Sequence, residues 1–521
     1  MVVPRVDLPI PAPAAPWPAM VGVPRLGRKW PGVARAAVTV AVPGLAGVLA
    51  GAGPVSAIAT LGAFAVVYGE TRPYRVRWRA VGIVGCVLVA LAGLGAAVGS
   101  VVHSAVAAGG SAWWPMLVVL TMTVVVASCA FVVDALRLGA PGAFLMLLTL
   151  EIASSLPVAG VPVATIVGWT AIGAVAALAV AMSGAIVRPR TAERTAVAAA
   201  VAAVEAVYEE NSAAHRRAAV HDLHAAWQCL HDAGLVGSEH PLVRALQSAH
   251  ARCATVLHGV DHHEADPEDD LRPQVPLHRP SVRYRLARAA HPDGRSVTVV
   301  LRLLVAGPVA GGVAVAAGLG RPDWAVITAA MILHQGPDRI LGSYRAAHRF
   351  VGTVLGLALL AGLSLFDVRG AALVLVCAAM MAGIEAYLVR NYGLAMVFIT
   401  PLALILGALG TPADLVLVSR ERLVETVIGV VVAFAVMWGV LPRAHRRILV
   451  DADDQVAGTI DRIVAADARE LAELRRDLEF DLHASTAAAI TAAHTEPAWT
   501  ARRWAEHRRL HERGYRILAG R

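Results

Sequence analysis

The stretch YRVRWRAVG at residues 74–82 returns as YRAAHRFVG at residues 344–352, so the pattern Tyr-Arg-x-x-x-Arg-x-Val-Gly occurs twice. Each copy stands at the start of one long apolar run and just after another. Apolar, glycine-rich helices often resemble one another in their glycines, but that general likeness does not account for the tyrosine and arginine spacing. The doubled stretch therefore predicts a chain built twice over from similar sets of apolar helices.

The composition places these helices in a membrane. Of the 521 residues, 57% are hydrophobic and only 16% are charged, and the mean hydropathy is +0.61. A soluble globular protein has about one quarter charged residues. The net charge of +8 comes mostly from arginines at the ends of apolar runs, which is typical of residues that set membrane topology. We therefore expect a lipid bilayer as partner, and no nucleic acid.

The predicted fold is an all-α polytopic membrane protein with six spans in each half. A span needs about 20 mostly apolar residues. The predicted spans are 35–53, 55–69, 80–102, 113–134, 140–159 and 162–187 in the first half, and 296–319, 323–334, 349–366, 370–389, 392–409 and 415–441 in the second. The eighth span, 323–334, is too short to cross unaided.

Polar stretches divide the chain further. The predicted parts are a tail at 1–34, a first membrane half at 35–190, a helical region at 191–294, a second membrane half at 295–443 and a C-terminal helical region at 444–521.

The arginines indicate on which side of the membrane each connection lies. With the N-terminus in the cytoplasm, nine arginines fall in cytoplasmic connections. Arg321 and Arg369 fall outside, joined by Arg420 and Arg422 near the outer start of the last span. Because short cytoplasmic loops carry the excess of positive charge, both termini and both polar helical regions are predicted to be cytoplasmic. The abundance of Arg, Ala, Val and Gly is typical of a GC-rich bacterial genome, so the expected location is a bacterial inner membrane.

The two halves match beyond the opening pattern. At a constant offset, Arg35, Val38, Gly44 and Gly51 correspond to Arg302, Val305, Gly311 and Gly318. Because six is an even number of spans, both halves enter the membrane from the same side. The sequence therefore predicts a parallel repeat, related by an axis along the membrane normal.

The second half resembles a known family. Its motifs are Trp324-Ala325-x-x-Thr328, Tyr344-Arg345, Arg349-x-x-Gly352-Thr353-x-x-Gly356 and, in the last span, Arg422-x-x-Glu425-Thr426-x-x-Gly429. Together with two membrane halves separated by a helical region, these motifs resemble the fusaric acid resistance protein-like (FUSC) family of the aromatic acid exporter superfamily. The first half is looser, with Ile83 in place of Thr353. The resemblance implies an inner-membrane protein involved in the efflux of aromatic carboxylic acids.

Four arginines of the doubled stretch are candidates for the substrate path. Arg75 and Arg79, like Arg345 and Arg349, are four residues apart and share one face of a helix. An anion leaving the cytoplasm would meet these pairs first, and guanidinium groups bind carboxylates through two hydrogen bonds. The alternative is that they anchor the helices at the membrane surface.

Charged residues inside predicted spans add four more candidates. Glu151 lies in the middle of the fifth span and Glu385 inside the tenth, where a carboxylate is costly unless it is paired, protonated or facing a cavity. Either can serve as the titrating carboxyl of a proton-coupled exporter or form a hydrogen bond between helices. Arg422 and Glu425 open the last span. They can hold an organic anion where the dielectric constant is low, or pair at the outer surface.

Aromatic residues gather at the predicted outer boundaries. Trp113, Trp114 and Trp324 stand at the outer ends of spans, where an aromatic belt is expected. Stacking against an aromatic substrate is the alternative.

We expect no enzyme activity, no cofactor and no metal site. Phosphate-binding loops, nucleophile elbows and His-Glu-x-x-His motifs are absent from the sequence, and the five cysteines show no paired spacing. His221-x-x-His224 has the spacing of helical metal ligands. The acidic, loop-like stretch that follows, with His262 and His263, is typical of a solvated segment.

The predicted function is a secondary transporter that exports organic, aromatic carboxylic acids with energy from the proton gradient. A passive organic-anion channel and a membrane scaffold that does not transport are the alternatives. A small organic anion is the expected substrate. A second copy of the chain, or an accessory protein in the periplasm or the cytoplasm, is left open as a further partner.

Overall fold

The structure, a computed structural model, describes residues 10–11, 20–22, 30–139, 141–258, 275–334, 336–366, 368–409 and 414–519. These residues form helices joined by short connections, and no strand occurs among them. The all-α fold class is confirmed. Most of the predicted tail at 1–34 lies outside the described residues, as do 259–274 with His262 and His263.

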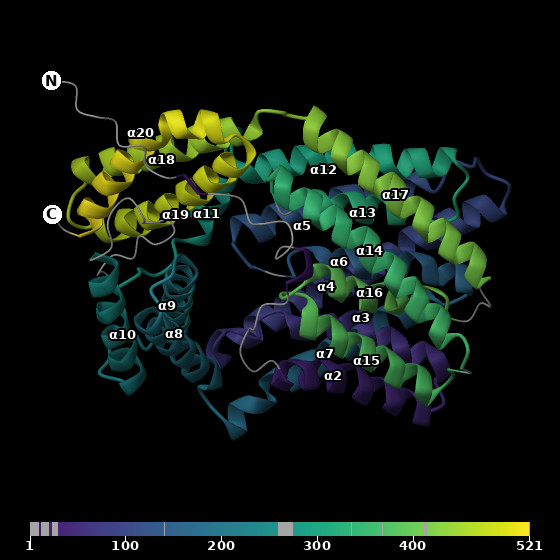
Figure 1. Cartoon of the computed structure of the whole chain (residues 1–521). Coiled ribbons are helices and arrows are strands. Elements are labelled where there is room, and N and C mark those ends of the chain that lie inside the picture. Colours follow the sequence, from purple (N-terminus) through teal and green to yellow (C-terminus); the bar gives the residue numbers. More distant parts are fainter. Residues whose placement is uncertain are drawn as a thin grey trace.

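Apolar helices fill both regions predicted to lie in the membrane (Figure 1). The first region contains α2 (Trp30–Leu49), η1 (Gly53–Ile58), α3 (Ala59–Ala63), η2 (Phe64–Val67), α4 (Tyr74–Ala107), α5 (Met116–Ala135), α6 (Phe144–Ser155), η3 (Leu156–Ala159) and α7 (Val163–Val187). The second contains α12 (Arg295–Ala316), α13 (Asp323–Leu333), α14 (Arg339–Leu363), α15 (Ala371–Tyr387), α16 (Tyr392–Gly407) and α17 (Leu415–Gly439).

Seven of these helices are long and apolar enough to cross a membrane, namely α2, α4, α5, α7, α12, α14 and α17. The chain is therefore a multi-pass membrane protein by its helices, but twelve full-length spans are not confirmed, because the other five apolar segments are shorter. The short eighth segment was predicted, and α13 indeed covers only 11 residues.

The broken segment η1–α3–η2 is buried inside the apolar region. Residues 56–66 are all buried. This burial is required, because an irregular backbone at membrane depth must be enclosed by protein. Gly62 of α3 lies against the backbone of α7, and Gly173 of α7 lies against the backbone of α3. A side chain at either glycine would force these two helices apart.

Helices of the two halves pack on each other reciprocally. α12 lies along α5, and α15 lies along α2. Gly311 of α12 receives Val119 of α5, and Gly44 of α2 receives Val374 of α15. A Cβ atom at either glycine would overlap the opposing valine, so both contacts depend on a residue without a side chain.

Two polar bundles lie at one end of the apolar region (Figure 1). The first is formed by α8 (Thr191–Glu209), α9 (Ala213–Ala233) and α10 (Pro241–His258), and the second by α18 (Ala444–Ala465), α19 (Leu471–Thr495) and α20 (Pro497–Leu518), while the short α11 (Val282–Ala289) precedes α12. Local signals set the ends of α9: the Ser212 side chain accepts a hydrogen bond from His215 N, and Gly234 ends the helix at φ 71°.

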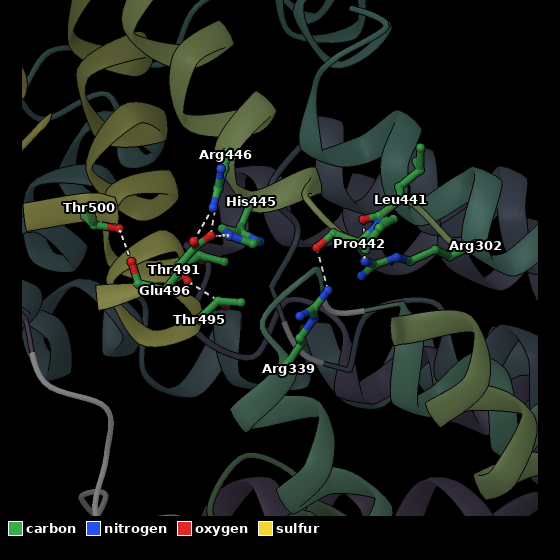
Figure 2. Close-up of polar contacts among 10 residues, drawn as sticks. All are labelled: Arg302, Arg339, Leu441, Pro442, His445, Arg446, Thr491, Thr495, Glu496 and Thr500. Carbon is green, nitrogen blue, oxygen red and sulfur yellow. Dashed lines mark hydrogen bonds and ion pairs between the residues drawn. The ribbon is translucent and has the colours of Figure 1, made fainter. Parts of the chain in front are cut away.

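Arginine side chains clamp the junction between α17 and α18 (Figure 2). The backbone turns at Leu441, whose φ of 53° is left-handed and unfavourable for a residue with a side chain. Arg302 Nη2 donates to the carbonyls of Met437 (3.2 Å) and Leu441 (3.3 Å). Arg339 donates to the Pro442 carbonyl at 2.5 Å. The arginines thus satisfy the carbonyl groups that the turn leaves without helical partners.

Candidate functional site

A cavity of about 560 Å³ lies between the two halves, at the end of the apolar region away from the polar bundles. The first half contributes the C-terminal part of α4 and the end of α6, including His103 and Ser154. The second half contributes the connection before α13 and the first turns of α17. Apolar side chains form much of the wall, while charged groups converge at Arg321, Asp323, Glu421, Arg422 and Glu425. Such a mixture is typical of a small-molecule site.

Glu151 and Arg321 form the first charged group beside this cavity. Glu151 projects from α6 and is completely buried. Its Oε1 pairs with Arg321, which also bonds Asp323 Oδ2 at 3.2 Å. The other oxygen, Oε2, has no hydrogen-bond partner among the described residues. The predicted intramembrane carboxylate is therefore paired across the two halves through one oxygen and unsatisfied at the second.

Arg422 forms the second charged group, on α17. Its guanidinium carbon lies 3.2 Å from the centre of the Trp324 ring, a close cation–π contact. The side chain is 2% exposed. Within the described residues, its Nε and Nη1 atoms find no hydrogen-bond partner. The nearby carboxylates of Glu425, Glu151 and Asp323 attract its charge. The face of the guanidinium is thus covered, while donors on its edge stay available.

Glu425 follows one turn after Arg422. It is 1% exposed, and its Oε1 has no partner in the part of the chain that the structure describes. Arg422 and Glu425, expected from the sequence as neighbours on one helix, both line the cavity. The two residues present an unsatisfied cation and an unsatisfied carboxylate to the same space.

Arg349, on α14, is a further buried cation near Arg422. It is fully buried, and Nη1 donates to the Met396 sulfur at 2.7 Å. Its Nε and Nη2 atoms have no partner at hydrogen-bond geometry among the described residues, although the Tyr392 hydroxyl lies close enough to interact with the guanidinium. Arg349 lies near enough to Arg422 for the two charges to repel each other.

The other predicted arginines lie elsewhere. Arg345 is half-buried one turn before Arg349, where Asp338 and Arg295 act on its charge. Arg75 and Arg79 are exposed. Arg75 donates to the Ala233 carbonyl of α9 at 3.3 Å, and Arg79 lies over the Trp78 ring at 5.2 Å. The two copies therefore differ in which arginine is buried. In the first copy it is Arg77, which donates to the Arg72 and Ala181 carbonyls, while in the second copy it is Arg349.

Glu385 is not part of the cavity. It is buried in α15 at 7% exposure, and it does not contribute to the wall that Arg422 and Glu425 line. The structure thus separates the two predicted intramembrane glutamates.

Two site residues were missed or misread from the sequence. Asp323 was not among the predicted site residues, although an aspartate at the first position of an apolar helix is a sequence signal for a buried ion pair. Trp324 was expected in an aromatic belt, which is wrong, since it is 2% exposed beneath Arg422. Trp113 and Trp114 are exposed at 55% and 39%, as a belt requires.

Larger cavities lie where the polar bundles meet the apolar helices. One of about 860 Å³ is lined by Arg137, His224, Arg295 and His483 among others. The His224 and His483 rings meet edge to face, 4.9 Å apart, and burial lowers the pKa of His224 to about 4. His221 and His224 form no metal-binding group within the described residues. This cavity lies between the bundles and the apolar helices, and Glu151, Arg349, Arg422 and Glu425 do not line it.

Residues 309–436 match the model of the family described as fusaric acid resistance protein-like. This confirms the resemblance seen in the sequence for that part of the chain and supports a function in membrane transport. No curated protein and no solved structure matches the chain. Arg321, Trp324, Arg349, Arg422 and Glu425 fall inside the matched segment, while Glu151 lies outside it.

Proposed function

We propose that this chain is a secondary transporter that exports organic acids, with aromatic carboxylates as the substrate class, across a bacterial inner membrane. The cavity that carries Arg422 between the two halves is the observation on which the proposal rests. Its volume of about 560 Å³ suits a small aromatic acid. The buried Trp324 and the apolar wall favour an aromatic body, and Arg422 favours a carboxylate.

Arg422 is the proposed carboxylate-binding group. Its stacked face fixes the guanidinium plane over Trp324, and the unpartnered Nε and Nη1 leave donors toward an incoming anion. Two hydrogen bonds to a carboxylate are the preferred geometry of arginine. In the buried surroundings of Arg422, each charge-assisted bond contributes about 1.5–3 kcal/mol.

The charge balance of the cavity supports proton coupling. Its wall carries the cations Arg321 and Arg422 against the anions Asp323, Glu421 and Glu425. A substrate carboxylate would add negative charge where the balance is already negative. A proton on Glu425 offsets that charge and removes the electrostatic attraction between Glu425 and Arg422. The substrate and Glu425 thus compete for one guanidinium, which links anion binding to proton binding.

Arg349 and Arg345 are the proposed inner part of the path. Arg349 lies on the helix that begins at the polar-bundle end, and its repulsion with Arg422 is relieved by an anion between them. A carboxylate could pass from Arg345 to Arg349 and then to Arg422. The polar bundles are proposed to face the cytoplasm, as the arginine distribution predicts.

The two halves are proposed to be a parallel repeat. The reciprocal packing of α12 on α5 and α15 on α2 supports this arrangement. The equivalent glycines Gly44 and Gly311 each receive a valine from the other half. The pattern is what a two-fold axis along the membrane normal would generate.

Transport by purified protein in liposomes tests the proposal. Phthalate is a suitable probe, because its two carboxylates keep it from crossing the bilayer unaided. Vesicles loaded with phthalate and a pH-sensitive dye should lose phthalate while the interior becomes more alkaline, because the proton on Glu425 leaves together with the anion. Arg422→Gln should lower the efflux rate by about 10-fold or more, the loss expected from one charge-assisted hydrogen bond. Arg420→Gln, an exposed site two residues earlier, should leave it unchanged.

Three outcomes count against the proposal. Equal phthalate efflux from the Arg422→Gln and Arg420→Gln proteins would mean that phthalate does not pass through this cavity. Phthalate efflux without a change of interior pH, at rates far above carrier turnover and driven by voltage alone, would indicate a channel. If neither phthalate nor any other aromatic carboxylate tested leaves the vesicles, the protein does not transport this class of compound.

A further inference from the structure

A polar cluster interrupts the core of the bundle formed by α18, α19 and α20. On one side of it lies an apolar cluster that includes Ala452, Ala488 and Trp504. On the other side lies a second apolar cluster that includes Val456 and Leu482. The interruption consists of Asp453, Ser485, His507 and His511, each at most 8% exposed. Four polar side chains inside a small bundle are costly unless their groups are satisfied.

The four side chains converge on one point. His507 Nδ1 lies 2.9 Å from Asp453 Oδ1. The Ser485 hydroxyl donates to the same oxygen at 2.6 Å and lies 2.9 Å from His511 Nε2. The two imidazole rings are 4.2 Å apart, centre to centre. One ligand atom from each of Asp453, His507 and His511 lies within 4.8 Å of the others.

We propose that Asp453, His507 and His511 bind a divalent metal ion of the zinc class. His507 and His511 are one helical turn apart on α20, the spacing that places two imidazoles on one side of an ion. Two imidazoles with one carboxylate are an established ligand set for zinc. Tetrahedral ligands about 2.1 Å from zinc are roughly 3.4 Å apart, so small side-chain rotations bring these three atoms into place.

Ser485 bridges two of the proposed ligands. Its hydroxyl bonds to Asp453 Oδ1 and His511 Nε2, which are the atoms that would bind the ion, so this hydroxyl must turn aside when the ion enters. Three protein ligands leave a fourth position for water. A set of one carboxylate and two neutral imidazoles leaves a net charge of +1 around a divalent ion, which is tolerable in this polar layer.

The bound ion would fasten the last helix to the rest of the chain. Asp453 comes from α18, which follows the clamped junction at Leu441, and both histidines come from α20. A purely hydrogen-bonded core predicts a bundle that melts at the same temperature with or without metal. The proposal predicts a bundle whose stability depends on the ion.

The full-length protein, purified in detergent and stripped with EDTA, is the material for the test. Isothermal titration with Zn²⁺ should show one tight site per chain. A Co²⁺-loaded sample should have the visible absorption of a tetrahedral ion. Zn²⁺ should raise the unfolding temperature, and EDTA should reverse the rise. Asp453→Asn and His511→Gln should each weaken Zn²⁺ binding by about 100-fold or more, since each removes a direct ligand.

Two further variants keep the result interpretable. His494→Gln removes a histidine of α19 that pairs with Asp338 at 3.0 Å outside the cluster, and it should bind Zn²⁺ as the unaltered protein does. Ser485→Ala keeps all three ligands and should retain the Zn²⁺-dependent rise in unfolding temperature. Identical melting with Zn²⁺ and with EDTA would overturn the proposal, as would equal Zn²⁺ affinity in the unaltered and His511→Gln proteins. These measurements are independent of transport.

Discussion

Replacing Arg349 with methionine is expected to stabilise the protein while it impairs transport. Arg349 is fully buried on α14, and its hydrogen bond goes to the Met396 sulfur, a weak acceptor. An arginine at the centre of a membrane helix costs about 2.5–3.5 kcal/mol on insertion scales, and repulsion from Arg422 adds to that cost. A flexible methionine side chain can fill most of the same space. The free energy of unfolding should therefore rise by about 2–3 kcal/mol.

The assay is unfolding in detergent with and without phthalate. A ligand present at 100 times its dissociation constant adds about 2.7 kcal/mol to the stability of the state that binds it. Unaltered protein should show this gain, and the Arg349→Met protein should not. Arg79→Met is the matched control, because Arg79 occupies the equivalent position of the first copy but is exposed, so its replacement should change neither the stability nor the gain from phthalate by much.

The result that refutes this reasoning is a loss of stability in Arg349→Met. Such a loss would mean that the guanidinium is a structural partner inside the helix bundle. Undiminished stabilisation by phthalate in the variant would likewise remove Arg349 from the anion path.

Three further outcomes are expected. Glu151→Gln should lower the free energy of unfolding by about 1–3 kcal/mol in a denaturant titration, less than for a fully buried pair, because Arg321 keeps Asp323 at 3.2 Å. An unchanged midpoint would count against a Glu151–Arg321 pair. Gly311→Ala should destabilise the protein by about 1–3 kcal/mol through overlap with Val119. Gly312→Ala, which meets nothing within 4 Å, should be neutral or stabilising in the same titration, and equal effects would contradict the packing of α12. Burial raises the pKa of Glu479 to about 7, so the folded state holds the proton more tightly than the unfolded one. Stability should then fall by on the order of 3 kcal/mol as pH rises from 4.5 to 7. That difference should vanish in Glu479→Gln, and a parallel pH profile in the two proteins would disprove it.

The apolar runs and the resemblance to the family could be predicted from the sequence because both are carried by local patterns. Hydropathy over a window and motif spacing need no knowledge of tertiary contacts. Breaks in the helices of the apolar segments were harder to predict. The run η1–α3–η2 is short and irregular because α7 packs closely on it through Gly62 and Gly173, a contact between segments distant in sequence.

The candidate site was only partly predictable for the same reason. Arg422 and Glu425 are three residues apart on one helix, so the sequence alone predicts that they lie close together. The pairing of Glu151 with Arg321 joins the two halves, and no local rule connects residues so far apart. Arg349 and Arg79 occupy the same position of the doubled stretch, yet Arg349 is buried and Arg79 is exposed. The surrounding helices, and not the motif, decide which arginine of each copy is buried. The proposed metal ligands Asp453, His507 and His511 also meet only in the folded bundle.

The reciprocal packing of the halves restricts how a substrate could cross. With α5 held by α12 and α15 held by α2, the halves are interlocked, each reaching into its counterpart. Rocking one half as a rigid body would pull Val119 from Gly311 and Val374 from Gly44 in the same movement. The frame made by these four helices is thus expected to stay fixed during a transport cycle. The cavity would then open and close by movements of the shorter helices beside it, α13 and α16, while the four-helix frame stays in place.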